Sequence, residues 1–234
     1  MRVFVLLPAA GIGTRMASAT TAPKQYVSIG GIPVLIHSLR AFLAVPSVTE
    51  ILVAVRKPEM SRVLGLVKEY GLGERVRVVE GGAHRQESVS RALAALQCAE
   101  GDIVLVHDAV RPLIETTVIE RTIEAIAKHG AAIVGLPAVD TIKQVERTSG
   151  GAIITATIPR ERIVQAQTPQ GARCDLLKLA FAEAEADGFA GTDEASLLER
   201  AGIEVAVVAG SPRNFKITQP GDLELAEFYL AAAK

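Results

Sequence analysis

The chain begins with a short apolar run followed at once by a loop of small residues, and this junction restricts the fold more than any other feature. Residues 3–7 (VFVLL) are all apolar, which predicts a strand buried on both faces of a parallel sheet. The loop at residues 8–16 (PAAGIGTRM) has few side chains that would keep a ligand away from its backbone N–H groups. With Arg15 in the loop and Lys24 shortly after it, the sequence predicts a phosphate-binding site beyond the first strand.

Two familiar glycine motifs do not fit this loop. A dinucleotide-binding fingerprint and a P-loop both require glycine at position 16, where Met16 stands. The P-loop also needs a Lys-Ser or Lys-Thr pair directly afterwards, and none follows. The pattern that remains, AAGxGxRM at residues 9–16 and PKQY at residues 23–26, resembles the sugar-phosphate nucleotidyltransferases. For the loop alone, an ordinary strand-to-helix turn with surface Arg and Lys is the alternative.

The composition fits one α/β domain and excludes several classes of partner. With 234 residues and 49% hydrophobic content, the chain can bury a sizeable core. Its 25 basic and 26 acidic residues nearly cancel, which argues against binding to nucleic acid or an anionic membrane. No apolar run is long enough to span a membrane and no export leader is evident, so we expect a cytoplasmic protein. Cys98 and Cys174 lack metal-ligand spacing, and Cys98 is expected to be a buried structural thiol.

Strand-like and helix-like segments alternate along the whole chain. This alternation predicts a single α/β domain over residues 1–234, with a mostly parallel sheet covered by helices. The resemblance of the first loop implies that this is a Rossmann-like nucleotidyltransferase domain. The rhythm changes at residues 139–160, where two β-prone segments flank a turn-forming cluster. We expect an inserted β-hairpin arm there, and because an isolated hairpin is marginally stable, we expect it to lie on a partner subunit. The other predicted elements are strands at 51–55, 76–79, 103–106, 131–136 and 205–208, and helices at 32–44, 58–70, 86–97, 115–128, 173–187 and 223–233.

Polar residues just beyond a predicted strand mark a candidate ligand cleft. Asp108 and Arg111 follow the strand at 103–106, and ligands of open α/β sheets bind beyond the carboxyl ends of strands. Asp108 could hold Mg²⁺ or hydrogen-bond an acceptor hydroxyl, and the alternative is a loop carboxylate paired with Arg111. His107 fits a packed, hydrogen-bonded residue better than a catalytic base.

Two predicted helix starts carry residues with more than one interpretation. Ser88 lies in the first turn of the helix at 86–97, where it could bind a polar ligand edge or act as a capping residue. Thr192 is expected to cap a later helix whose positive end suits Asp193 and Glu194. The alternative for this acidic pair is a role near a bound metal.

Further motifs follow the first two in a fixed order. They are GGxxRQxSV from Gly81, VHDAxRP from Val106, DT from Asp140, TPQ from Thr168, TDEA from Thr192 and NxKIT from Asn214. Together the eight motifs resemble the 2-C-methyl-D-erythritol 4-phosphate cytidylyltransferases of non-mevalonate isoprenoid synthesis. The resemblance covers essentially the whole chain, the hairpin included, and indicates the monofunctional form without a fused second enzyme. Ala83 stands where some members have an acidic residue, so no side-chain contact from this position to the base is expected.

The resemblance implies that an acceptor phosphate oxygen attacks the α-phosphate of CTP and that pyrophosphate leaves, with Mg²⁺ or another divalent cation accompanying CTP. Such a reaction needs positioned positive charge more than covalent chemistry. The resemblance also implies a homodimer formed through the hairpin arm. Carried over by position, the catalytic residues are Arg15, Lys24, Arg160 and Lys216; the nucleotide-binding residues are Pro8, Ala9, Ala10, Gly11, Gly13, Gly82 and Ser88; and the acceptor-binding residues are Asp108, Arg111, Thr141 and Thr168, with Asp108 also the candidate metal ligand.

Two other functions stay open at this level. A ribitol-5-phosphate cytidylyltransferase shares the loop, the hairpin and the CTP chemistry, although the NxKIT segment and the DT entry to the hairpin lean toward methylerythritol phosphate. The second is a catalytically silent nucleotide-binding regulator on the same fold. Retention of both Arg15 and Lys24 argues against it, because binding alone does not require a cation aimed at the reacting phosphorus.

Overall fold

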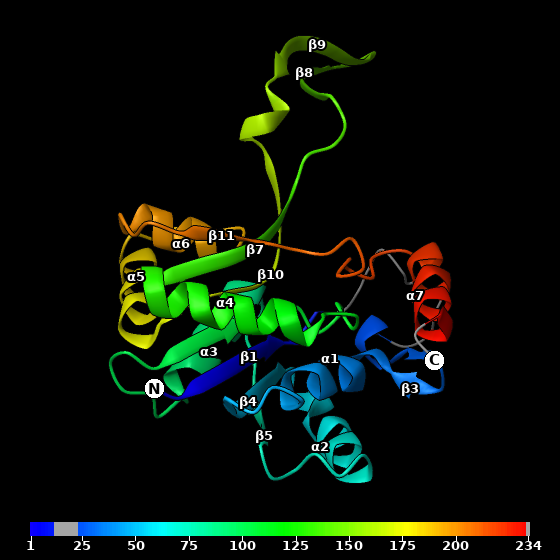
Figure 1. The fold of residues 1–234 in the computed structure, drawn as a ribbon, viewed down its shortest axis with the longest axis vertical. Helices are drawn as coiled ribbons and strands as arrows, with labels where there is room; N and C mark the ends of the chain where they lie inside the picture. Colours follow the sequence, from blue (N-terminus) through cyan, green and yellow to red (C-terminus); the bar gives the residue numbers. More distant parts are fainter. Residues whose placement is uncertain (12–22, 233–234) are drawn as a thin grey trace.

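A central β-sheet covered by helices forms the body of the protein, and a long hairpin projects from it (Figure 1). The computed structural model describes residues 1–11 and 23–232. Its main-sheet strands are β1 (Val3–Pro8), β4 (Val48–Val55), β5 (Val76–Glu80), β6 (Ile103–Val106), β7 (Ala131–Pro137), β10 (Val164–Arg173) and β11 (Ala206–Ala209). Their order across the sheet is β11-β7-β10-β6-β1-β4-β5, and only β10 runs antiparallel to its neighbours. The predicted mostly parallel α/β fold is therefore confirmed.

Helices cover both faces of the sheet, and each predicted helix is present with ends shifted by a few residues. They are α1 (Val34–Leu43), α2 (Met60–Glu69), α3 (Arg85–Ala94), α4 (Thr116–His129), α5 (Cys174–Ala186), α6 (Glu194–Arg200) and α7 (Pro220–Ala232), with 3-10 turns η2 (Lys24–Tyr26), η3 (Lys57–Glu59) and η4 (Arg160–Arg162). Helix α1 begins later than predicted because β3 (Ile32–Pro33) pairs with β2 (Ser28–Ile29). Within residues 1–11 and 23–232, no helix has both the length and the apolarity needed to cross a bilayer.

The cap of α6 differs from the prediction. Asp193, and not Thr192, is the capping residue, and its Oδ1 accepts the Ser196 N–H at 3.0 Å. The Ser196 Oγ in turn accepts the Asp193 N–H, which completes a capping box. Asp193 stands directly before the first helical residue, so its short carboxylate reaches the free N–H groups of the first turn. The start of α6 is therefore firmly fixed.

The apolar sequence of β1 is explained by the two cores that it joins. Val3, Val5 and Leu7 pack into a core with α1, α2 and α4, whereas Phe4 and Leu6 pack on the other face with α3, α5 and α6. Successive side chains of a strand point to opposite faces, and helices cover both faces here. Leu6 and Leu7 are fully buried, which stabilises the fold by about 2 kcal/mol for each side chain.

Strand β10 is the one main-sheet strand that the sequence pattern does not predict. No strand is expected from the sequence at residues 164–170, and the structure pairs this segment with both β6 and β7 as an antiparallel strand. Its buried residues include Gln167, Thr168 and Gln170, so the usual apolar signal of a central strand is missing. Their side chains are hydrogen-bonded inside the protein, which makes this burial tolerable. Strand β10 brings Thr168 to the end of β6.

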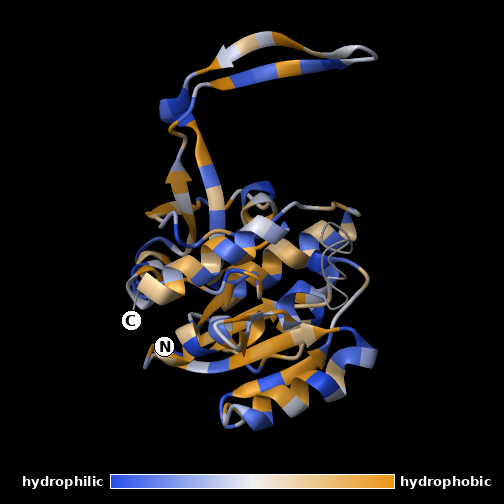
Figure 2. Ribbon diagram, turned by 90° about the vertical axis from the view of Figure 1, so that its right-hand side faces the viewer, coloured by the Kyte–Doolittle hydropathy of each residue, from blue (hydrophilic) through white to orange (hydrophobic). Residues whose placement is uncertain are grey.

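The hairpin expected at residues 139–160 consists of β8 (Ile142–Thr148) and β9 (Gly151–Ile158), which pair antiparallel. It extends away from the sheet, and Figure 2 shows hydrophobic residues along both of its strands. Ile153 and Ile154 are 62% and 60% exposed. Two strands with this much apolar surface in solvent are marginally stable alone. We name residues 139–160 the arm.

Cys98 and Cys174 form a disulfide with their Cα atoms 6.4 Å apart. The expectation of a free buried thiol at Cys98 is therefore wrong. Cys174 N–H donates to Asp102 O at 2.7 Å, which brings the start of α5 against the loop that follows α3. The two cysteines are 76 residues apart in the sequence, so only the tertiary contact reveals the pair.

Candidate active site

A cavity of about 340 Å³ lies where β1, β5 and β6 end. Leu6 pairs with Val106 across β1 and β6, so the loops that follow these two strands lie side by side. The cavity therefore unites the predicted phosphate loop with the predicted cleft at Asp108. Its lining residues are Pro8, Ala9, Ala10, Gly11, Lys24, Gln25, Ala83, His84, Arg85, Ser88, Asp108, Ala109, Val110 and Lys216.

Gln25 supports the described part of the small-residue loop. Its Nε2 donates to Ala9 O at 2.8 Å and to Gly11 O at 3.2 Å, and only 4% of the residue is exposed. These carbonyl oxygens would repel a phosphate, but both accept hydrogen bonds from the Gln25 amide. Gln25 has no role among the residues expected from the sequence, although its place in the PKQY motif is a signal. Gly13 and Arg15 lie outside the described residues.

Lys24 lines the cavity from the start of η2. Its Nζ donates to Ile217 O at 3.2 Å, directly beside Lys216 in the chain. Ile217 is fully buried and its N–H donates to Val110 O at 2.9 Å, which fixes this extended segment against the loop after β6. Two lysines predicted to act on different phosphates thus line one cavity, an arrangement that suits a polyanionic ligand.

Ser88 hydrogen-bonds the loop at Gly81 and Gly82 to the start of α3. Its Oγ accepts the Gly82 N–H at 3.0 Å and donates to His84 O at 2.9 Å, and the residue is 1% exposed. Glu87 accepts the Ala83 N–H at 2.7 Å and lies so close to Gly82 that a Cβ there would come within 2.3 Å of it. Ser88 therefore holds the loop at Gly82 to α3 and lines the cavity, but it does not cap the helix, whose N-cap residue is His84.

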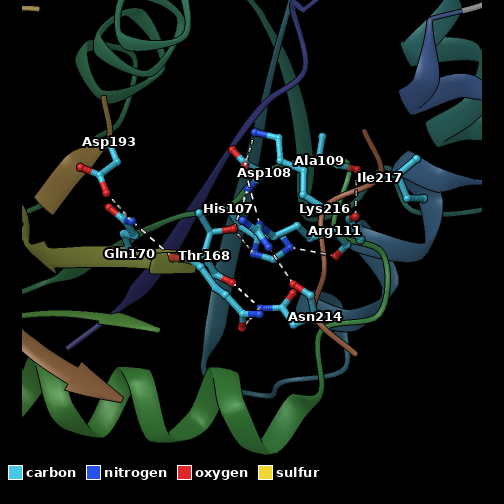
Figure 3. Close-up of polar contacts among 12 residues, drawn as sticks. His107, Asp108, Ala109, Arg111, Thr168, Gln170, Asp193, Asn214, Lys216 and Ile217 are labelled. Carbon is cyan, nitrogen blue, oxygen red and sulfur yellow. Dashed lines mark hydrogen bonds and ion pairs between the residues drawn. The ribbon is translucent and has the colours of Figure 1, made fainter. Parts of the chain in front are cut away.

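Asp108 lies among three cationic side chains, of which Figure 3 labels Lys216 and Arg111. Its Oδ2 is 2.8 Å from Lys216 Nζ and 3.6 Å from Arg111 Nε, and its Oδ1 is 3.1 Å from Arg85 Nε. Burial by itself raises the pKa of this carboxyl, but the charges of Arg85 and Lys216 outweigh burial and hold the pKa well below its usual range. Asp108 is therefore an ionised carboxylate of fixed orientation.

The surroundings of Asp108 do not fit a protein-held divalent cation. Both of its oxygens already face cationic side chains, and a metal ion there would be repelled by them. Among the residues that the structure describes, no group of three His, Cys, Asp or Glu side chains is arranged to hold a metal. The expected metal role of Asp108 gains no support from this geometry.

His107 orients the strand end as a neutral residue (Figure 3). Its Nε2 contacts Arg111 O at 3.0 Å and must donate, so Nδ1 accepts from Thr168 Oγ1 at 3.0 Å. Thr168 Oγ1 in turn accepts the Asp108 N–H at 3.1 Å. Full burial lowers the pKa of His107 to about 4. Thr168 thus lies beside Asp108 as predicted, but its hydroxyl hydrogen is directed toward His107.

Arg85 and Glu194 form an ion pair that is not expected from the sequence, and the Glu194 side chain is buried in it. Arg85 Nη1 and Nη2 donate to the two carboxylate oxygens of Glu194 at 2.7 and 2.9 Å. Burial raises the pKa of Glu194, and the Arg85 charge opposes that shift. Glu194 lies in the first turn of α6, at the positive end of the helix as expected, and Arg85 occupies both of its oxygens. The alternative role near a bound metal gains no support.

The two predicted site residues on the arm lie apart from this cavity. Thr141 and Arg160 are exposed, and neither lines the cavity of its own chain. Arg160 Nη1 instead donates to Val139 O at 2.6 Å, at the base of the arm. Within one chain, Lys24 and Lys216 are brought together, whereas Arg160 is not.

Comparison with known proteins agrees with this geometry. The family model described as 2-C-methyl-D-erythritol 4-phosphate cytidylyltransferase matches residues 3–232. The chain is 71% identical to the protein of that name from Acidobacterium capsulatum, with 98% of both chains covered. It is 51% identical to the protein of the same name from Solibacter usitatus, with 98% of this chain and 96% of that protein covered.

Solved structures give the same assignment. The 2-C-methyl-D-erythritol 4-phosphate cytidylyltransferase of Francisella tularensis superposes with a TM-score of 0.81 at 33% identity and covers 97% of this chain and 99% of its own. The enzyme of that name from Thermus thermophilus superposes with a TM-score of 0.78 at 34% identity, covering 99% and 100%. The match to the family model spans nearly the whole chain, so the chain belongs to the family of 2-C-methyl-D-erythritol 4-phosphate cytidylyltransferases.

Proposed function

We propose that this protein transfers the cytidylyl group of CTP to 2-C-methyl-D-erythritol 4-phosphate in the non-mevalonate isoprenoid pathway. An acceptor phosphate oxygen attacks the α-phosphorus, the bond from that phosphorus to the bridging oxygen breaks, and pyrophosphate leaves. The observation that carries this proposal is one cavity that joins the small-residue loop and Lys24 to Lys216 and Asp108. The family relationship supports it.

On the nucleotide side, residues 8–11 and the loop at Gly82 receive CTP, with Ser88 supporting that loop. Lys24, together with Arg15, meets the charge that develops on the α-phosphate. Charge stabilisation of this kind is a large contribution in phosphoryl-type transfer, because little covalent chemistry is left to the protein.

On the acceptor side, Asp108 accepts a hydrogen bond from a hydroxyl of the polyol, and Lys216 binds the phosphate of the polyol. An ionised carboxylate with both oxygens fixed suits a hydroxyl donor. Arg111 and Thr168 hold the loop that carries Asp108, through the contacts of Arg111 and Thr168 with His107.

The protein forms a homodimer in which the arm of each subunit completes the partner's cavity with Thr141 and Arg160. Support comes from the exposed apolar residues of the arm and from the separation of Arg160 from its own cavity. A twofold pairing of arms buries that surface and supplies a second cation for the acceptor phosphate.

A divalent cation enters with the triphosphate of CTP and is not held by Asp108. Mg²⁺ is commonly bound through substrate phosphates with few protein carboxylates. The cation supplies charge neutralisation on the phosphates, and the residues named above supply the remaining contacts. Because CTP is an intracellular nucleotide, we assign the protein to the cytoplasm.

Pyrophosphate release tests the proposal. We expect release from CTP with 2-C-methyl-D-erythritol 4-phosphate, and little release with ribitol 5-phosphate or with ATP or UTP in place of CTP, because a polar site strongly rejects a mismatched hydrogen-bonding partner. Preference for ribitol 5-phosphate would identify the other cytidylyltransferase. Binding of CTP without release for any polyol phosphate would identify a silent regulator.

A further inference from the structure

The Arg85–Glu194 ion pair borders the cavity, and the proposed reaction leaves it without a role. Glu194 is 1% exposed, and both of its oxygens are occupied by the terminal nitrogens of Arg85. A bidentate contact of this kind fixes the plane of the guanidinium as well as its position. Arg85 can therefore not swing freely into the cavity that it lines.

The remaining nitrogen of Arg85 is directed to Asp108. Arg85 Nε donates to Asp108 Oδ1 at 3.1 Å, and Lys216 Nζ is 2.8 Å from the other oxygen, Oδ2. Each carboxylate oxygen of Asp108 thus has its own cationic partner. Rotation of the carboxylate would break both contacts, so Arg85 and Lys216 together determine which edge of Asp108 faces the cavity.

Glu194, at the other end of this series of contacts from Asp108, is fixed by the start of α6. Glu194 is the first residue of α6, and Gln170 on β10 holds that helix start through Asp193 Oδ2 at 2.9 Å and the Ala195 N–H at 3.0 Å. Figure 3 shows Gln170 directed to Asp193 on the opposite side of Thr168 from the cations at Asp108. The orientation of Asp108 is therefore linked through Arg85 and Glu194 to the start of α6.

We propose that Arg85 and Glu194 are positioning residues that orient the Asp108 carboxylate toward the acceptor hydroxyl. The inference rests on the proposed function, since it needs a polyol acceptor at Asp108. Neither residue touches the acceptor. Loss of either one lets the carboxylate turn, which weakens binding of the acceptor and leaves the CTP loops at Gly11 and Gly82 unchanged.

Steady-state kinetics of Arg85→Met and Glu194→Gln separate these effects. We expect the KM for the acceptor, methylerythritol phosphate, to rise about tenfold to a hundredfold, the loss typical of one charged hydrogen bond, and the KM for CTP to stay within about twofold. The matched control is Arg77→Met, which removes an exposed ion pair to Glu50 at 2.9 Å, away from the cavity. It should leave both KM values unchanged.

A double-mutant cycle with Asp108→Asn tests whether Arg85 acts through Asp108. Calorimetric Kd values for the acceptor, measured with a non-hydrolysable CTP analogue, remain accessible in variants without turnover. We expect Arg85→Met to change the Kd by less than about twofold in the Asp108→Asn background, because the group that it orients is already altered. Arg85→Lys, which keeps the charge but loses the bidentate fork, is the second variant if Arg85→Met does not fold.

An unchanged acceptor KM, equal rises in both KM values, or full additivity with Asp108→Asn would overturn the positioning role. Absence of wild-type turnover with every polyol phosphate would instead refute the proposed function, and the positioning role with it. Wild-type activity together with unaffected variants would refute the positioning role alone.

Discussion

The position of Arg160 on the arm leads to a quantitative test of a shared active site. Lys24 lines the cavity in the body of each chain, and Arg160 lies on the arm outside that cavity. If the arm completes the partner's site, the Lys24→Ala lesion of one chain and the Arg160→Ala lesion of its partner fall in the same site of a mixed dimer. One site of that dimer then carries both lesions, and the other carries neither.

The expected recovery follows from subunit statistics. Equal amounts of the two inactive chains, refolded together, give mixed dimers in about half of the molecules, and each mixed dimer has one intact site of two. Activity should therefore return to about a quarter of the wild-type value, measured as pyrophosphate release per chain. If Lys24 and Arg160 of the same chain served one site, every site would keep one lesion and no activity would return.

A matched mixture controls for refolding and subunit exchange. Lys24→Ala mixed with Lys216→Ala damages the body of both chains, so each site of a mixed dimer keeps one lesion and no recovery is expected. Native mass spectrometry verifies that mixed dimers have formed. A verified mixed population of Lys24→Ala and Arg160→Ala chains that stays inactive would refute the shared site.

Three further predictions concern single residues. Lys24→Ala should lower kcat at least a hundredfold, with little change in the KM for CTP, because about 3 kcal/mol of transition-state stabilisation is lost. The control is Lys57→Ala, a change at an exposed lysine. Equal losses in kcat and in affinity for CTP would make Lys24 a binding residue only. Burial lowers the pKa of His107 from 6.5 to about 4. Between these two pH values, His107 takes up a proton in the unfolded chain but not in the folded chain. Urea unfolding at pH 7 and pH 5 should therefore show a His107 contribution of about 2 kcal/mol that is lost as the pH falls, and His107→Gln should show a correspondingly smaller pH dependence. Reduction of the Cys98–Cys174 disulfide, which spans 76 residues, should lower stability by about 4 kcal/mol and Tm by roughly 10 °C, whereas a Cys98→Ser chain should not respond to reductant.

Much of the fold follows from local sequence patterns. The strand predicted at 103–106 is β6 without any shift, and the arm lies where the turn-forming cluster indicates. Such elements are set by the spacing of apolar residues and by turn chemistry, which neighbouring residues determine. Strand β10 departs from this rule, because its buried polar residues are matched by partners on other segments.

The candidate site divides in the same way. The sequence placed Lys24, Asp108 and Lys216 in one cleft, on the grounds that ligands bind at strand ends and that the motifs resemble a family. It gave no role to Gln25, although that residue lies within a motif, because the sequence does not show that its amide binds the backbone of the small-residue loop.

By itself, the sequence determined the succession of strands and helices, the small-residue loop and the position of the arm, because each depends on residues that are near one another in the chain. Only the tertiary structure decided which distant residues meet. Arg85 and Glu194 are 109 positions apart, and their ion pair exists because the first residues of α3 and α6 meet, although α3 packs on β1, β4 and β5 and α6 on β7 and β10. The cysteine pair and the antiparallel placement of β10 have the same origin, since contacts between distant segments depend on how the whole chain packs and leave no periodic signal in the sequence.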